Sequence, residues 1–225
     1  MDKIVLKSVK SSVQYQGQFV ELAFDTLASP VRLYKNLLKN LGKYGASAKD
    51  LKFEAVEISE ANLTCLLVDL NGGIRIGLDR LEVTFYDLGL VGQDTANQII
   101  LDSHEALSDM ENPIKFKTHV VKIETHAQLA NVSYDNLVSN YINFPPSLGD
   151  KVSGGLALYL GDDPEKGERG ATVMVDRSVV VDGGVYIYAA VEFDASLIPI
   201  ESVRQKFSEF HGRCLDHLSL MMERD

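Results

Sequence analysis

Two segments about a hundred residues apart carry the same helical pattern of apolar positions. Residues 29–45 and residues 132–146 each place apolar side chains at intervals of three and four, and each carries two asparagines at matching positions. Such spacing puts the apolar side chains on one face of an α-helix, so both segments are predicted to be amphipathic helices. The matching residues are Tyr34, Asn36, Leu37, Leu38, Asn40 and Leu41 in the first segment, and Tyr134, Asn136, Leu137, Val138, Asn140 and Tyr141 in the second.

The ends of both predicted helices carry the residues that usually begin and stop a helix. Ser29 and Ser133 stand where an N-cap is expected, and Pro30 suits the first helical turn. Gly42 or Gly45 can end the first helix. The pair Pro145–Pro146 can stop the second.

Strand patterns surround both helices in the same order. A strand is expected before each helix, at 18–25 and at 116–125. Three strands are expected after each helix: 51–58, 63–70 and 74–86 in the first half, and 155–160, 171–181 and 185–193 in the second. A further helix closes each half, at 95–110 and 199–223, the first with Ile99, Ile100, Ala106, Leu107 and Met110 facing inward.

Each half also contains an Asn-Gly-Gly or Asp-Gly-Gly turn, at 71–73 and 182–184, which we expect between its last two strands. Asn or Asp followed by Gly suits a hairpin turn with positive φ, so these glycines are predicted to be structural. The sequence therefore predicts an α+β fold made by internal duplication of a β-α-β-β-β-α unit. The predicted domains are residues 1–112 and 113–225, which could also form one continuous domain.

This element order resembles the layouts of TATA-binding-protein-like and Bet v 1-like folds. The resemblance implies antiparallel curved sheets with long helices packed on one face. The chain also resembles a scattered family of uncharacterised bacterial proteins of similar length, whose closing helix carries Phe or Leu next to His, as "SEFHGRCLDHL" at 208–218 does here. That resemblance covers most of the chain in layout and implies no known activity. An Arg-Tyr-Ile-Asn segment usual in the family is absent, and "VVKIETHAQL" at 120–129 stands in its place.

The last predicted helix, at 199–223, is long for its half. Its apolar stripe runs from Ile200 to Met221 at steps of three and four. A helix of that length spans about 35 Å, more than one small sheet needs. We favour the interpretation that the excess covers the sheet of the other half. The alternative is a homodimer whose interface contains Phe207, Phe210 and Met221.

Composition limits the partners that the protein is expected to bind. The chain has 225 residues and a net charge of −10, so a phosphate backbone would meet repulsion and nucleic-acid binding is disfavoured. No apolar run is long enough for a membrane span, and the N-terminal residues lack the apolar core of a secretory signal. Cys65 and Cys214 are far apart and are expected to be free thiols in a reducing cytoplasm.

Two segments resemble metal-binding motifs but lack residues that those motifs require. "HEALS" at 104–108 begins like a zinc-protease motif, but Ser108 stands where the second His is required. The acidic loop "GDDPEKGERG" at 161–170 lacks the ligand order of an EF-hand, and a solvated hairpin loop is expected there. The sequence assigns no catalytic residue, metal ligand or cofactor. His104 with Asp102 or Glu105 is the one constellation that merits a catalytic test, and no effect is expected.

Two functional interpretations follow. The first is a non-enzymatic cytoplasmic binding protein, with a protein partner or self-association, such as an accessory subunit of a bacterial stress or defence system. The second is a protein that binds an apolar small molecule in a cavity between the sheet and the C-terminal helix. Tyr186 and Tyr188 alternate with apolar neighbours and could line such a cavity, although a half-exposed position on the sheet is the favoured interpretation.

Overall fold

The computed structural model describes all residues except 1–2, 56, 89, 131, 143–153 and 224–225. The described residues form two compact units, each assembled from separate stretches of the chain. Unit 1 contains Met1–Ser11, Lys122–Val191 and Gln205–Asp225, and unit 2 contains Ser12–Val121 and Glu192–Arg204. The predicted α+β class with an antiparallel sheet is confirmed, whereas the internal duplication stays a prediction.

Four consecutive strands of unit 2 form a meander. These are β2 (Leu51–Glu54), β3 (Asn62–Leu67), β4 (Gly72–Ile76) and β5 (Arg80–Phe85), and each pairs antiparallel with the next. The strand β5 then pairs with the second half of β1 (Ile4–Phe19), in a register that matches Tyr15 with Val83. Next to β1 lies β6 (Phe116–Leu129). Alternate residues of these strands are buried, so one face of the sheet forms the core.

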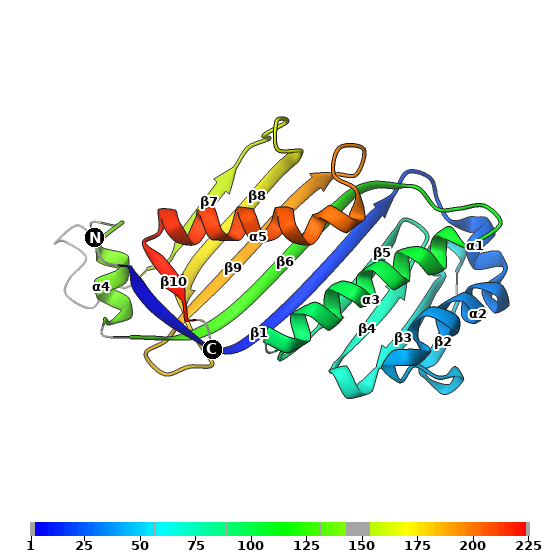
Figure 1. The fold of residues 1–225 in the computed structure, drawn as a ribbon, viewed down its shortest axis with the longest axis horizontal. Coiled ribbons are helices and arrows are strands. Elements are labelled where there is room, and N and C mark those ends of the chain that lie inside the picture. Colours follow the sequence, from blue (N-terminus) through cyan, green and yellow to red (C-terminus); the bar gives the residue numbers. More distant parts are fainter. Residues whose placement is uncertain (1–2, 56, 89, 131, 143–153, 224–225) are drawn as a thin grey trace. The chain divides into compact units, whose positions relative to one another are not determined.

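Unit 2 contains the α-helices α1 (Phe24–Ala28), α2 (Pro30–Leu41) and α3 (Leu90–Ser108). Figure 1 shows α3 lying along the strands of the unit with α2 beside it. Leu33, Leu37 and Leu41 of α2 are fully buried. The five inward residues predicted for the closing helix, from Ile99 to Met110, are all buried. An amide donor of Asn36 reaches the carbonyl of Ala106 at 3.1 Å and joins the two helices.

Unit 1 has its own strands and helices. The strands are β7 (Leu156–Leu160), β8 (Glu168–Arg177), β9 (Val185–Asp194) and the short β10 (Leu220–Met222). In strand order, β10 pairs with β1, which is followed by β6, β9, β8 and β7. The helices are α4 (Tyr134–Ser139) and α5 (Ile200–His217), and Figure 1 shows α5 crossing the face of β8 and β9. Ser133 caps α4 as predicted, because its hydroxyl accepts the Asn136 N–H.

Unit 2 also contains short 3₁₀ turns. They are η1 (Gly42–Tyr44), η2 (Ala48–Asp50), η3 (Ile58–Glu60) and η4 (Val68–Leu70). In η2 the Ser47 and Asp50 side chains form a reciprocal capping box.

Three predictions in the first half are wrong. The strand expected at 18–25 is instead β1, at Ile4–Phe19, and the expected region continues into α1. The segment 74–86, expected as one strand, contains a turn at Gly77–Asp79 that separates β4 from β5. The Gly77 N–H donates a hydrogen bond to the Arg80 carbonyl and closes this turn. The Asn71 turn, which has positive φ as predicted, therefore joins β3 to β4 and does not lie between the last two strands.

The last helix is shorter than expected. It ends at His217, because Ser219 adopts a left-handed conformation with φ of 51° and turns the chain into β10. The strand β10 then pairs in parallel with the start of β1, with Ile4 opposite Leu220. The second amphipathic helix, expected at 132–146, is α4 and ends at Ser139; Pro145 and Pro146 lie outside the described residues.

Candidate functional site

The sequence suggested His104 with Asp102 or Glu105 as a group worth testing for catalysis, but Asp102 does not pair with His104. His104 and Asp102 both lie on α3, but their side chains have different partners. The Asp102 carboxylate accepts from Tyr44 at 2.7 Å and Gln98 at 3.1 Å, and pairs with Lys43 at 2.8 Å. Burial alone would raise the pKa of Asp102, but these hydrogen bonds outweigh it and lower the pKa. Asp102 therefore fixes α3 to the turn after α2 and is not the partner of a catalytic imidazole.

His104 instead belongs to a buried cluster that the sequence analysis missed. The Tyr15 hydroxyl lies 2.5 Å from Nε2 of His104 and 2.8 Å from Nδ1 of His119. Tyr15 comes from β1, His104 from α3 and His119 from β6. The His104 ring also stacks on Phe116 with centroids 3.9 Å apart. No spacing along the chain could indicate this cluster, because its members are 89 and 104 residues away from Tyr15.

The cluster is closed to solvent and electrically neutral. Tyr15, His104 and His119 are 1%, 7% and 2% exposed. Burial, followed by the neighbouring His119, lowers the pKa of His104 to about 3. Burial lowers the pKa of His119 to about 4, against a small opposing effect of Glu201. Burial also raises the pKa of Tyr15. A substrate cannot reach these groups from solvent, so the cluster is a polar element of the core.

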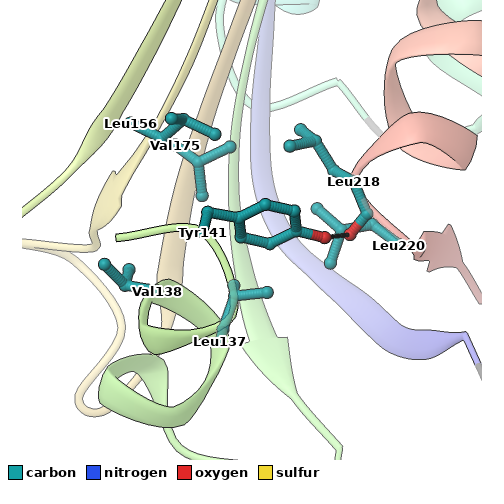
Figure 2. A pocket seen from close by; sticks show the side chains of 7 residues that line it. All are labelled: Leu137, Val138, Tyr141, Leu156, Val175, Leu218 and Leu220. Atoms are coloured by element: carbon teal, nitrogen blue, oxygen red, sulfur yellow. Dashed lines mark hydrogen bonds between the residues drawn. The ribbon is translucent and has the colours of Figure 1, made fainter. Parts of the chain in front are cut away.

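A small apolar pocket lies in unit 1, where α4, β7, β8 and β10 approach one another (Figure 2). The Tyr141 ring crosses it, and its hydroxyl donates to the carbonyl of Leu218 at 2.6 Å. The cavity has a volume of about 10 Å³, which is close to the minimum for one water molecule. It does not have room for an organic ligand. The lining residues are Leu137, Val138, Tyr141, Leu156, Val175, Leu218 and Leu220.

Tyr186 and Tyr188 lie on the other face of the sheet. Their neighbours in β9, from Val185 to Val191 at alternate positions, are buried, whereas both tyrosines are half-buried. Strand alternation therefore turns the two phenols away from the core. This is the half-exposed position that the sequence analysis favoured. They do not line the pocket in Figure 2.

The tyrosines share this face with side chains from the two neighbouring strands. We call Glu124, His126, Met174, Tyr186 and Tyr188 the tyrosine face. The His126 ring lies 5.0 Å from that of Tyr186, and its Nδ1 is 2.9 Å from the Ser178 hydroxyl. Met174 is 36% exposed between the buried Val173 and Val175. Burial, and then the negative charge of Glu124, raises the pKa of Tyr186 and Tyr188, so both phenols stay protonated at neutral pH.

The three residues predicted for a dimer interface have different environments. Phe207 and Phe210 are 6% and 1% exposed and belong to the core beneath α5. Met221 is 45% exposed, but it lies in β10 and not on the helix. The aromatic residues of this helical stripe therefore pack in the core of their own chain.

Comparison with known proteins adds no relative: no protein-family model matches the chain, and no curated protein matches it in sequence. Within the part of the chain that the structure describes, no helix is long and apolar enough to cross a membrane. No group of three or more His, Cys, Asp or Glu side chains is placed to hold a metal ion among those same residues.

Proposed function

We propose that the protein is a non-enzymatic binding protein that engages a polypeptide partner through the tyrosine face of unit 1. The observation that carries the proposal is the position of Tyr186 and Tyr188, half-buried on the face of β9 that points away from the buried Val185, Ile187 and Ala189. Tyrosine gives a large, rigid apolar area with one polar tip, which suits protein recognition.

The chemistry of the face supports a protein partner more than a reaction. His126 is held by Ser178 and packs on Tyr186, and Met174 adds a flexible apolar surface. The buried Tyr15–His104–His119 cluster has the residue types of an acid–base site, but it is closed to solvent. With a net charge of −10, the protein favours partners that present a basic surface.

The proposed setting is the cytoplasm, as an accessory subunit of a larger bacterial assembly. Cys65 and Cys214 are both free thiols, which suits a reducing compartment. The bacterial origin rests on the layout resemblance alone. The alternative of an apolar small-molecule ligand has less support, since the pocket beside Tyr141 has a volume of about 10 Å³.

The test combines native mass spectrometry with variants of the face. The protein is purified gently from its source, the polypeptide that accompanies it is identified, and the affinity is measured by calorimetry. The double variant Tyr186→Ala/Tyr188→Ala is expected to weaken binding at least about tenfold, as interface tyrosines commonly do. The matched control is Tyr86→Ala in unit 2, which removes a 50% exposed tyrosine and is expected to leave affinity unchanged.

Two results would overturn the proposal. One is a partner affinity that the double variant does not change. The other is a bound compound of a few hundred daltons on each chain with no accompanying polypeptide, which would favour the small-molecule alternative.

A further inference from the structure

The strand β7 lies at one end of the strand order, and among the described residues it pairs on one side only, with β8. Its sequence, Leu-Ala-Leu-Tyr-Leu, contains no charged residue. Tyr159 is 79% exposed and Leu160 is 46% exposed. An apolar strand of this kind presents unpaired backbone groups together with uncovered side chains, which is a template for another strand.

The strand at the other end of the order has the opposite character. There, β2 reads Leu-Lys-Phe-Glu, and both Lys52 and Glu54 are exposed. Charged side chains on an edge strand discourage pairing with another chain. The same molecule thus protects one edge of its strand order with charge and leaves the other edge without that protection.

The side chains of β7 alternate between two faces. Leu156, Leu158 and Leu160 lie opposite Val175, Val173 and Ala171 of β8, so the leucines share the face of the buried Val173 and Val175, with Leu160 at its exposed end. Ala157 and Tyr159 lie on the other face, opposite Met174 and Thr172. The strand therefore has three leucines on one face and one small and one large residue on the other.

We propose that β7 pairs antiparallel with β7 of a second copy of this chain, around a two-fold axis at Leu158. This register places Leu156 opposite the Leu160 of the other copy, and Ala157 opposite its Tyr159. Each exposed tyrosine then covers a small alanine, and leucines meet leucines. A two-fold interface requires such self-complementarity, and with Leu158 on the axis this five-residue strand supplies it.

The strands β7 and β8 carry no net charge, which is compatible with two like copies, and the acidic residues nearest to β7 along the chain are Asp162 and Asp163 in the loop that follows it. The β7 strand is uncharged, and β8 carries two residues of each sign: Glu168, Arg169, Asp176 and Arg177. The net charge of −10 therefore comes from other parts of the chain, and salt that screens it should strengthen the dimer. Five paired residues form a small interface, so the dimer is expected to dissociate at about micromolar concentration.

The experiment is sedimentation velocity over a concentration series, with one variant that weakens the interface and one that traps it. Tyr159→Lys changes a 79% exposed side chain, so the fold is expected to survive, and the dissociation constant is expected to rise at least tenfold. Lys52→Ala on β2 is the control and is expected to leave the dissociation constant unchanged.

Leu158→Cys tests the register. Opposite residues in an antiparallel pair have Cα atoms about 4.5–5.5 Å apart, within reach of a disulfide. Oxidation is expected to give a disulfide between position 158 of two copies, identified by mass spectrometry, whereas Lys52→Cys gives none. A monomer at every concentration overturns the proposal. So does a dimer that Tyr159→Lys leaves equally stable and that Leu158→Cys does not cross-link.

Discussion

The Tyr15 hydroxyl lies 2.8 Å from Nδ1 of His119, within a core that excludes solvent from both side chains. On its other side the same hydroxyl lies 2.5 Å from Nε2 of His104. A phenol has one proton, so it donates to one imidazole and accepts an N–H from the other. The Tyr15 hydroxyl thus provides a hydrogen-bond partner for one nitrogen of each of two buried imidazoles, which come from different elements.

Removing that hydroxyl is expected to destabilise the protein without changing its shape. Tyr15→Phe leaves two buried imidazole nitrogens without a partner, which costs about 1–3 kcal/mol. Urea unfolding followed by circular dichroism measures the loss. Tyr86→Phe, at a 50% exposed position, is the control and should have no effect. An unchanged unfolding midpoint for Tyr15→Phe would mean that the hydrogen bonds contribute nothing.

The same cluster predicts acid sensitivity. The pKa of His104 is lowered to about 3 and that of His119 to about 4, from 6.5. In the unfolded chain both imidazoles take up protons as pH falls below 6.5, while the folded state resists protonation. Their contribution to stability is therefore complete above pH 6.5 and is lost as pH falls toward 4 and 3.

Unfolding measured across that range in wild type and in the double variant His104→Leu/His119→Leu checks this prediction. The variant is expected to show a shallower loss of stability between pH 6.5 and 4. Equal slopes would assign the acid sensitivity to other groups.

A glycine beside the cluster is expected to be irreplaceable. A Cβ at Gly17 would lie 2.6 Å from both the Tyr15 hydroxyl and Cε1 of Phe116. Gly17→Ala therefore forces the core apart and should cost about 1–3 kcal/mol. Gly42→Ala is the matched control, because no atom lies within 4 Å of its added Cβ and its φ of −57° suits alanine. In thermal denaturation, the midpoint of Gly17→Ala is expected to fall below that of the wild type, while the midpoint of Gly42→Ala stays close to it.

The aromatic residues of α5 distinguish core from interface. Phe210 is 1% exposed, so Phe210→Ala should destabilise the chain by about 3–5 kcal/mol. Met221→Ala, at a 45% exposed position, should leave the stability nearly unchanged. Chemical denaturation at several protein concentrations measures both effects. A Phe210→Ala variant that keeps its stability but no longer forms a dimer would instead support the hypothesis of a dimer interface on α5.

The elements that could be predicted are those whose pattern is local. The burial of Leu37 and Leu41 on α2, the inward residues of α3 and the strand predicted at 116–125, which continues to Leu129 as β6, follow from apolar spacing within one segment. The turn at Gly77–Asp79 was missed, because the apolar alternation on both sides reads as one continuous strand. The α+β class was therefore within reach of the sequence, whereas the number of strands in the first half was not.

The sequence by itself determined which segments have an apolar face, because side-chain periodicity is a property of neighbours along the chain. Only the tertiary structure decided that Ile4–Phe19 is a strand, since polar residues interrupt its pattern and its partners are β5, β6 and β10. Only the tertiary structure brought Tyr15 to His104 and His119, from three elements far apart in the chain. Such contacts depend on how elements pack, and no local spacing records that.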